Sequence, residues 1–191
     1  MIYISTGYMN EKMSDLLKKF SRYGINNLEL SSGIYEKNKI KTILKKKKLY
    51  NLTLHNYFPP PLKPFTMNLC SSNDEIFKKT LNLIKKNISN SARIGAKFYS
   101  FHAGFLIDPK PSELGKKIKK KILIDEKIAE KKFIFGLNKV SKIAKKKNIQ
   151  LLIENNVLTK KNLNIFGKNP LLMVSTQQTL RLANMFPSNV K

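Results

Sequence analysis

Two histidines and one carboxylate stand where apolar segments of the chain end. His55, His102 and Glu154 each follow a short apolar run, and the two histidines are the only ones in the sequence. An imidazole can ligate a metal ion, hydrogen-bond a hydroxyl group or move a proton near neutral pH. A carboxylate buried without a partner is strongly disfavoured, so we expect Glu154 to have either a divalent cation or a lysine beside it.

Three further polar residues are weaker candidates for the same site. Asn155 and Asn156 follow Glu154 directly and could supply neutral contacts to a ligand. Glu29 lies in the apolar segment 28–30, where a ligand contact and a structural ion pair are equal alternatives. Each histidine, taken alone, could equally be a hydrogen-bonded core residue. Their equivalent positions at strand ends favour a shared site.

Strand-like and helix-like segments alternate along the chain, and the candidate residues close the third, fourth and fifth strands. The strands are expected at 2–6, 27–30, 52–57, 97–102 and 149–154. Apolar spacing of three and four predicts helices near 13–23, 40–44, 73–94, 125–144 and 175–184. Ser72 and Glu75 are spaced as a capping box for the third helix, and Gly95 is expected to end it.

Repeated strand–helix units indicate a parallel sheet with right-handed crossovers. An open doubly wound sheet is disfavoured because Thr6-Gly7-Tyr8-Met9 is not a glycine-rich phosphate turn. A TIM barrel is favoured because it carries its functional side chains at the ends of several strands and tolerates the long connections after the third and fourth strands. A full barrel needs about 250 residues. We therefore expect one domain over 1–191, an incomplete (β/α) barrel of about five units plus the start of strand six, truncated at its carboxyl end.

The composition excludes several classes of protein. The net charge is +25, but only three of the 37 basic residues are arginines. Lysine lacks the forked geometry that recognises phosphate and guanine, so nucleic acid is not the expected partner. The lysine runs 45–48, 116–117, 119–121 and 145–147 are expected at solvated helix ends. The single cysteine fits a reducing cytoplasm, and no apolar run is long enough to cross a membrane.

Three motifs resemble one superfamily. Leu54-His55-Asn56-Tyr57-Phe58-Pro59-Pro60-Pro61, Phe101-His102-Ala103-Gly104-Phe105 and Leu152-Ile153-Glu154-Asn155-Asn156 are similar to segments of the xylose isomerase-like TIM-barrel superfamily. That superfamily groups sugar and sugar-phosphate isomerases and epimerases with the type IV apurinic endonucleases. The resemblance extends from the first strand to the start of the sixth.

The resemblance implies different roles in the two branches. In the isomerase and epimerase branch it implies that Glu154 is a metal ligand and usually an acid or base, with later ligands falling after Lys191. In the endonuclease branch it implies that His55 and His102 are also zinc ligands.

The function implied first is a metal-dependent isomerase or epimerase of a sugar or sugar derivative. A divalent ion (Mn, Mg, Co or Zn) would be held partly by Glu154, and proton abstraction next to the carbonyl would give an enediolate. The residues expected to contact the sugar are His55, His102, Asn155 and Glu29. The alternatives are an apurinic endonuclease and an inactive truncated barrel, whose exposed sheet edge would favour a homo-oligomer.

Overall fold

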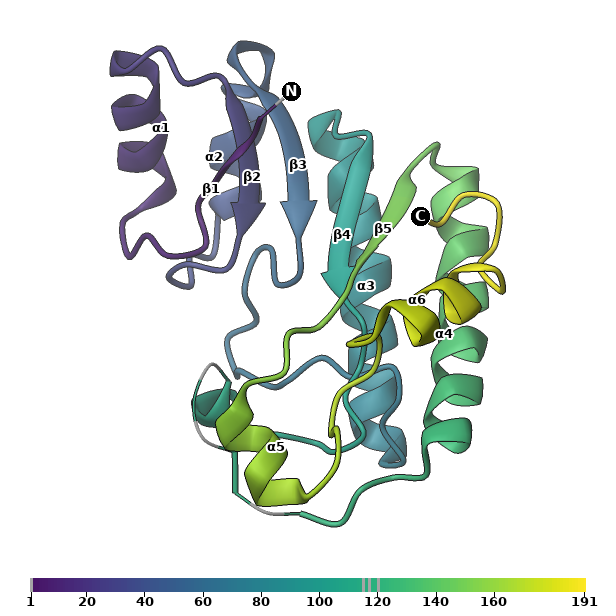
Figure 1. Cartoon of the computed structure of the whole chain (residues 1–191). Coiled ribbons are helices and arrows are strands. Elements are labelled where there is room, and N and C mark those ends of the chain that lie inside the picture. The colour runs from purple at the N-terminus through teal and green to yellow at the C-terminus, as the bar shows by residue number, and fades with distance from the viewer. Residues whose placement is uncertain (1, 115, 117, 120) are drawn as a thin grey trace.

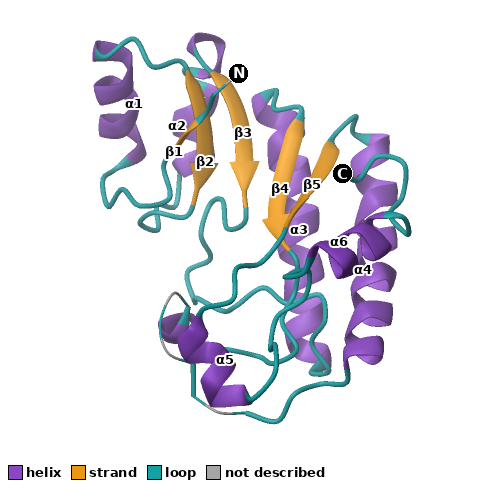
Figure 2. Cartoon of the chain, viewed as in Figure 1, coloured by secondary structure: helices purple, strands orange, loops and turns teal. Residues whose placement is uncertain are grey.

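The computed structural model describes residues 2–114, 116, 118–119 and 121–191 and contains a single parallel sheet (Figures 1 and 2). Its five strands follow one another in chain order, and each pairs with the next in parallel. The strands are β1 (Ile4–Ser5), β2 (Asn27–Ser31), β3 (Asn51–His55), β4 (Phe98–His102) and β5 (Gln150–Glu154). The α-helices are α1 (Met13–Arg22), α2 (Lys39–Leu44), α3 (Asp74–Ile94), α4 (Glu126–Lys146), α5 (Lys160–Phe166) and α6 (Thr176–Ala183).

The core lies between the sheet and the layer formed by α1 to α4. Alternate strand residues face this layer and are fully buried, among them Leu28, Leu54 and Tyr99. Each helix contributes the apolar stripe that its spacing predicts. Phe77, Leu81, Ile84 and Ile88 of α3 are all buried, as are Leu137, Val140 and Ala144 of α4. The opposite face of the sheet carries the polar residues of the strands.

The start of α3 differs from the expected capping box. The N-cap is Asn73 and not Ser72, since the Asn73 side chain accepts hydrogen bonds from the amides of Glu75 and Ile76. Asparagine is as good an N-cap as serine, so the helix begins one residue later. Gly95 ends α3 in the left-handed conformation, as expected.

Two other features differ from the sequence analysis, a helix that it did not predict and the place of two lysine runs. The connection after β5 contains α5, which has little apolar periodicity but is capped by Thr159 and ended by Gly167 in the left-handed conformation. The described residues of the lysine runs 116–117 and 119–121 do not lie at a helix end. They belong to the connection between β4 and α4, and Lys117 and Lys120 lie outside the described residues.

The last residues extend the sheet as expected for the start of a sixth strand. The Leu151 amide donates to the Asn189 carbonyl, and Lys191 exchanges hydrogen bonds with Leu151 and Ile153 at 2.7–2.9 Å. Residues 189–191 therefore run parallel to β5 along its outer edge. The described chain is an incomplete (β/α) barrel, which confirms the expected fold class. None of the described helices is both long and apolar enough to cross a membrane.

Candidate functional site

The register of the sheet brings the three candidate residues to one edge. His102 is directly opposite Glu154, and His55 is opposite Ser100, two residues before His102. Since residues two apart on a strand share a face, all three side chains point away from the helix layer. They lie at the carboxyl ends of β3, β4 and β5, toward which the arrowheads in Figure 1 point.

Glu154 is the centre of this group. Its Oε1 is 3.0 Å from Nδ1 of His55, and its Oε2 is 3.7 Å from Nδ1 of His102. The two imidazole rings lie edge to face, with centroids 5.2 Å apart. Among the described residues, the side chains that pair with Glu154 are these histidines, and no lysine pairs with it. The side chain of His55 is 12% exposed, whereas His102 and Glu154 are nearly half exposed.

The surroundings set the charges of the group. The hydrogen bond from His55 lowers the pKa of Glu154 more than partial burial raises it. Burial lowers the pKa of His102, although the Glu154 carboxylate opposes this shift. Near neutral pH the site therefore presents an ionised carboxylate and a neutral imidazole at His102.

These atoms fit a divalent metal ion. One donor atom from each of the three residues can be chosen so that all lie within 4.8 Å of one another. Imidazole nitrogen and carboxylate oxygen are the ligands that zinc, cobalt and manganese accept. Glu154, already ionised and partly exposed, is the donor best prepared to bind a cation.

Two residues that sequence analysis missed support the histidines. Ser100 Oγ lies 2.9 Å from Nδ1 of His55, and the Asn56 side chain contacts Nε2 of the same ring. In the sequence, only their positions relative to the two histidines indicate that they could belong to the site. Ser100 lies two residues before His102 on the same strand face, and Asn56 follows His55 directly.

The other candidates lie around this group in different ways. Glu29 faces the same side of the sheet from β2, and no ion pair involves it among the described residues. Asn155 is exposed beside Glu154. The side chain of Asn156 makes its hydrogen bonds within the fold. It is buried and its side-chain amide donates to the carbonyls of Ala103 and Leu172, so it joins β4 to the segment before α6.

An apolar pocket of about 190 Å³ lies in the connection after β3. It is lined mainly by prolines and aromatics: Ser32, Tyr57, Pro60, Pro61, Pro64, Phe65, Pro111 and Leu114. Tyr57, which lines this pocket, is two residues after His55 in the sequence. Burial raises the pKa of Tyr57 to about 12. Its hydroxyl accepts a hydrogen bond from the Met67 amide.

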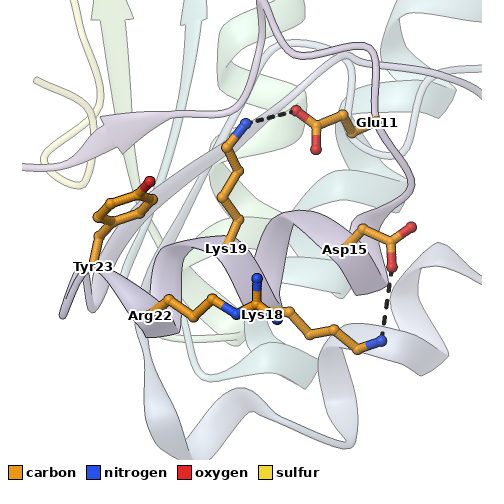
Figure 3. A pocket seen from close by; sticks show the side chains of 6 residues that line it. All are labelled: Glu11, Asp15, Lys18, Lys19, Arg22 and Tyr23. Carbon is orange, nitrogen blue, oxygen red and sulfur yellow. Dashed lines mark hydrogen bonds and ion pairs between the residues drawn. The ribbon is translucent and has the colours of Figure 1, made fainter.

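A larger cavity of about 410 Å³ lies against α1 and takes no residue from β3, β4 or β5 (Figure 3). Two lysines in it are paired with carboxylates, Lys19 with Glu11 at 3.1 Å and Lys18 with Asp15 at 3.9 Å. Most of its charged side chains are paired with one another, so we interpret it as a solvated groove. It shares no residue with the candidate site.

The fold and the site together define a family. The family model described as xylose isomerase-like TIM barrel matches residues 17–191, and the chain belongs to this family. A comparison of the sequence with curated proteins finds no match.

Several solved structures share the fold. L-ribulose 3-epimerase has a TM-score of 0.70 and 13% identity, covering 100% of this chain and 59% of that one. A D-tagatose 3-epimerase-like protein has a TM-score of 0.68 and 14% identity, covering 99% and 63%. A protein from Thermus thermophilus, soaked with ZnCl2, has a TM-score of 0.63 and 14% identity, covering 98% and 63%. The chain thus spans about three fifths of the length of these structures, and at such identities the likeness is one of fold.

Proposed function

We propose that this chain forms the part of a sugar isomerase or epimerase that holds a divalent metal ion and one side of the sugar. The observation that carries the proposal is the Glu154 carboxylate between two histidines, at the carboxyl ends of adjacent parallel strands. Catalytic groups of TIM barrels lie at this end of the strands. Epimerases acting on ketoses are among the structures that share the fold.

Each residue has a part in the proposed reaction. Glu154 binds the ion, which would polarise the carbonyl and the neighbouring hydroxyl of the sugar. His55 and His102 donate or accept hydrogen bonds at sugar oxygens, and Asn155 and Glu29 extend these contacts. A carboxylate base would remove a proton from the carbon beside the carbonyl to give an enediolate, and a second carboxylate would return a proton on the other face, which changes the configuration.

Deuterium exchange tests this proposal. The full-length protein is incubated in D2O with D-fructose, D-tagatose or L-ribulose and with Mn²⁺, Mg²⁺, Co²⁺ or Zn²⁺. We expect NMR to show deuterium at the carbon next to the carbonyl of at least one ketose. Glu154→Gln should slow this exchange by about 100-fold or more, since it removes the anionic oxygen at nearly constant shape.

The control is Glu75→Gln, which removes an exposed carboxylate of α3 and should leave the exchange rate unchanged. Absence of exchange with every ketose and every ion would contradict the proposal. So would exchange that proceeds at the same rate in Glu154→Gln.

An apurinic endonuclease is the second candidate. Two histidines beside Glu154 could form part of a zinc cluster, and the net charge of +25 favours DNA. The near absence of arginine weakens it.

A further inference from the structure

The orientation of the Asn56 side chain follows from a backbone amide. The His102 amide donates to Oδ1 of Asn56 at 3.2 Å. A backbone N–H can only donate, so the atom that faces it must be the oxygen of the Asn56 side chain. The NH2 group of the same side chain is then the one that contacts His55 Nε2.

The backbone of Asn56 is held in place as well. Its carbonyl accepts hydrogen bonds from the Asn87 side chain at 2.7 Å and from the Tyr99 hydroxyl at 2.9 Å. Its amide donates to the Ser100 carbonyl at 2.8 Å. The residue has a φ of +45°, a left-handed conformation that asparagine tolerates better than most residues. These contacts fix the position of the Asn56 backbone from which the side chain extends.

This orientation selects one form of His55. Because an NH2 group only donates, Nε2 of His55 has to accept, and the proton of the neutral ring lies on Nδ1. The Nδ1 atom faces Glu154 Oε1 at 3.0 Å and Ser100 Oγ at 2.9 Å, both of which can accept. We propose that Asn56 is a positioning residue that holds His55 as the Nδ1–H tautomer, so that His55 presents a hydrogen-bond donor to the site and not a metal ligand.

The opposite tautomer leaves donors facing each other. A proton on Nε2 would point at the Asn56 NH2 group, and turning that amide would bring the NH2 group against the His102 amide. Two donors that face each other without an acceptor disfavour either arrangement in this partly buried site, and we expect the Nδ1–H form to exceed the other about tenfold or more.

A consequence for the ligand set follows. A histidine ligates a metal through an unprotonated nitrogen, and neither nitrogen of His55 is free in this form. Among the three residues, Glu154 and His102 remain to bind an ion. The assignment of the His55 donor to a sugar oxygen rests on the proposed function, whereas the tautomer does not.

NMR of the metal-free protein measures the tautomer without substrate. In the ¹⁵N-labelled protein at about pH 8, where histidine is neutral, long-range ¹H–¹⁵N correlations distinguish protonated from unprotonated ring nitrogens. The chain has two histidines, so His102→Gln assigns the His55 pattern. We expect a proton on Nδ1 of His55. A proton on Nε2 in the wild-type protein would overturn the proposal, whatever the epimerase assay shows.

Asn56→Asp provides the matched change. It keeps an oxygen for the His102 amide and replaces the NH2 group by an acceptor of the same shape. We expect it to place a proton on Nε2 of His55 and, by freeing Nδ1, to raise the affinity for Zn²⁺ about tenfold in competition with a chromogenic chelator. His55→Gln in the Asn56→Asp background should remove this gain.

Two outcomes would count against the proposal. One is a His55 proton that stays on Nδ1 alone in Asn56→Asp. The other is a Zn²⁺ gain that survives His55→Gln, since the added charge and not the histidine would then explain it. If Asn56→Asp fails to fold, the wild-type spectrum decides by itself.

Discussion

Glu113 stabilises the long connection between β4 and α4 through its carboxylate. Oε2 accepts hydrogen bonds from the Lys121 ammonium at 2.8 Å and the Lys110 amide at 2.7 Å. Oε1 accepts a hydrogen bond from the Lys119 amide at 3.3 Å. Led by the Lys121 hydrogen bond, these contacts lower the pKa of Glu113 to about 2, from 4.5. A carboxyl group with a lowered pKa in the folded state stabilises the fold above the pKa of the unfolded chain. This contribution is lost as the pH falls toward 2.

We therefore expect Glu113→Gln to lower the free energy of unfolding by about 1–3 kcal/mol at neutral pH. The difference from wild type should shrink as the pH falls below 4.5. Urea unfolding in a pH series measures this, with Glu75→Gln as the exposed control. A difference that is the same at every pH would show that Glu113 acts through packing and not through its charge.

Sequence analysis predicted the residues at the strand ends better than their neighbours. The meeting of His55, His102 and Glu154 follows from parallel pairing, because the carboxyl ends of such strands share one edge. The part played by Asn56 could not be predicted in this way. It depends on a hydrogen bond to the amide of His102, on another strand, and on a left-handed backbone conformation that no spacing reveals.

At the scale of elements, the corrected N-cap of α3 gives a direct test. Asn73→Ala removes the acceptor for two amides of the first turn and should cost about 1 kcal/mol of stability. Ser72→Ala is the matched control and should cost much less, since Ser72 is exposed one residue before the cap. Thermal unfolding of both variants measures the difference. Equal losses, or a larger loss in Ser72→Ala, would restore serine as the cap.

The elements were predictable where the apolar pattern was long. α3 and α4 each bury a regular stripe, so their positions follow from spacing. α5 is short and its sequence Lys-Lys-Asn-Leu-Asn-Ile-Phe has no such stripe, so only the caps Thr159 and Gly167 indicate it. Its formation depends on these caps and on contacts such as that of the Asn162 side chain with the Ile118 amide.

At the scale of the whole molecule, the net charge predicts how strongly and how specifically the protein binds DNA. All but three of its 37 basic residues are lysines, which attract phosphate without recognising a base or a missing base. We expect weak binding to any duplex, falling about 1,000-fold between roughly 50 and 200 mM salt. Fluorescence anisotropy with an abasic duplex and an intact control, with Zn²⁺ present, should give affinities equal within about twofold.

Cleavage of the abasic strand, or a clear preference for the abasic duplex, would instead favour the endonuclease. Equal affinities for the two duplexes, without cleavage, would fit a sugar enzyme whose lysines lie on solvated faces.

The unbroken strand order has a consequence for how the molecule is made. Every strand pairs with the one translated just before it, and residues 189–191 pair with β5 in the same way. As the chain leaves the ribosome, the strand with which each new strand pairs has therefore already been synthesised. Domains fold from the amino terminus during synthesis, and pairing between consecutive units avoids waiting for distant segments. The sheet can be assembled in the order in which its codons are read.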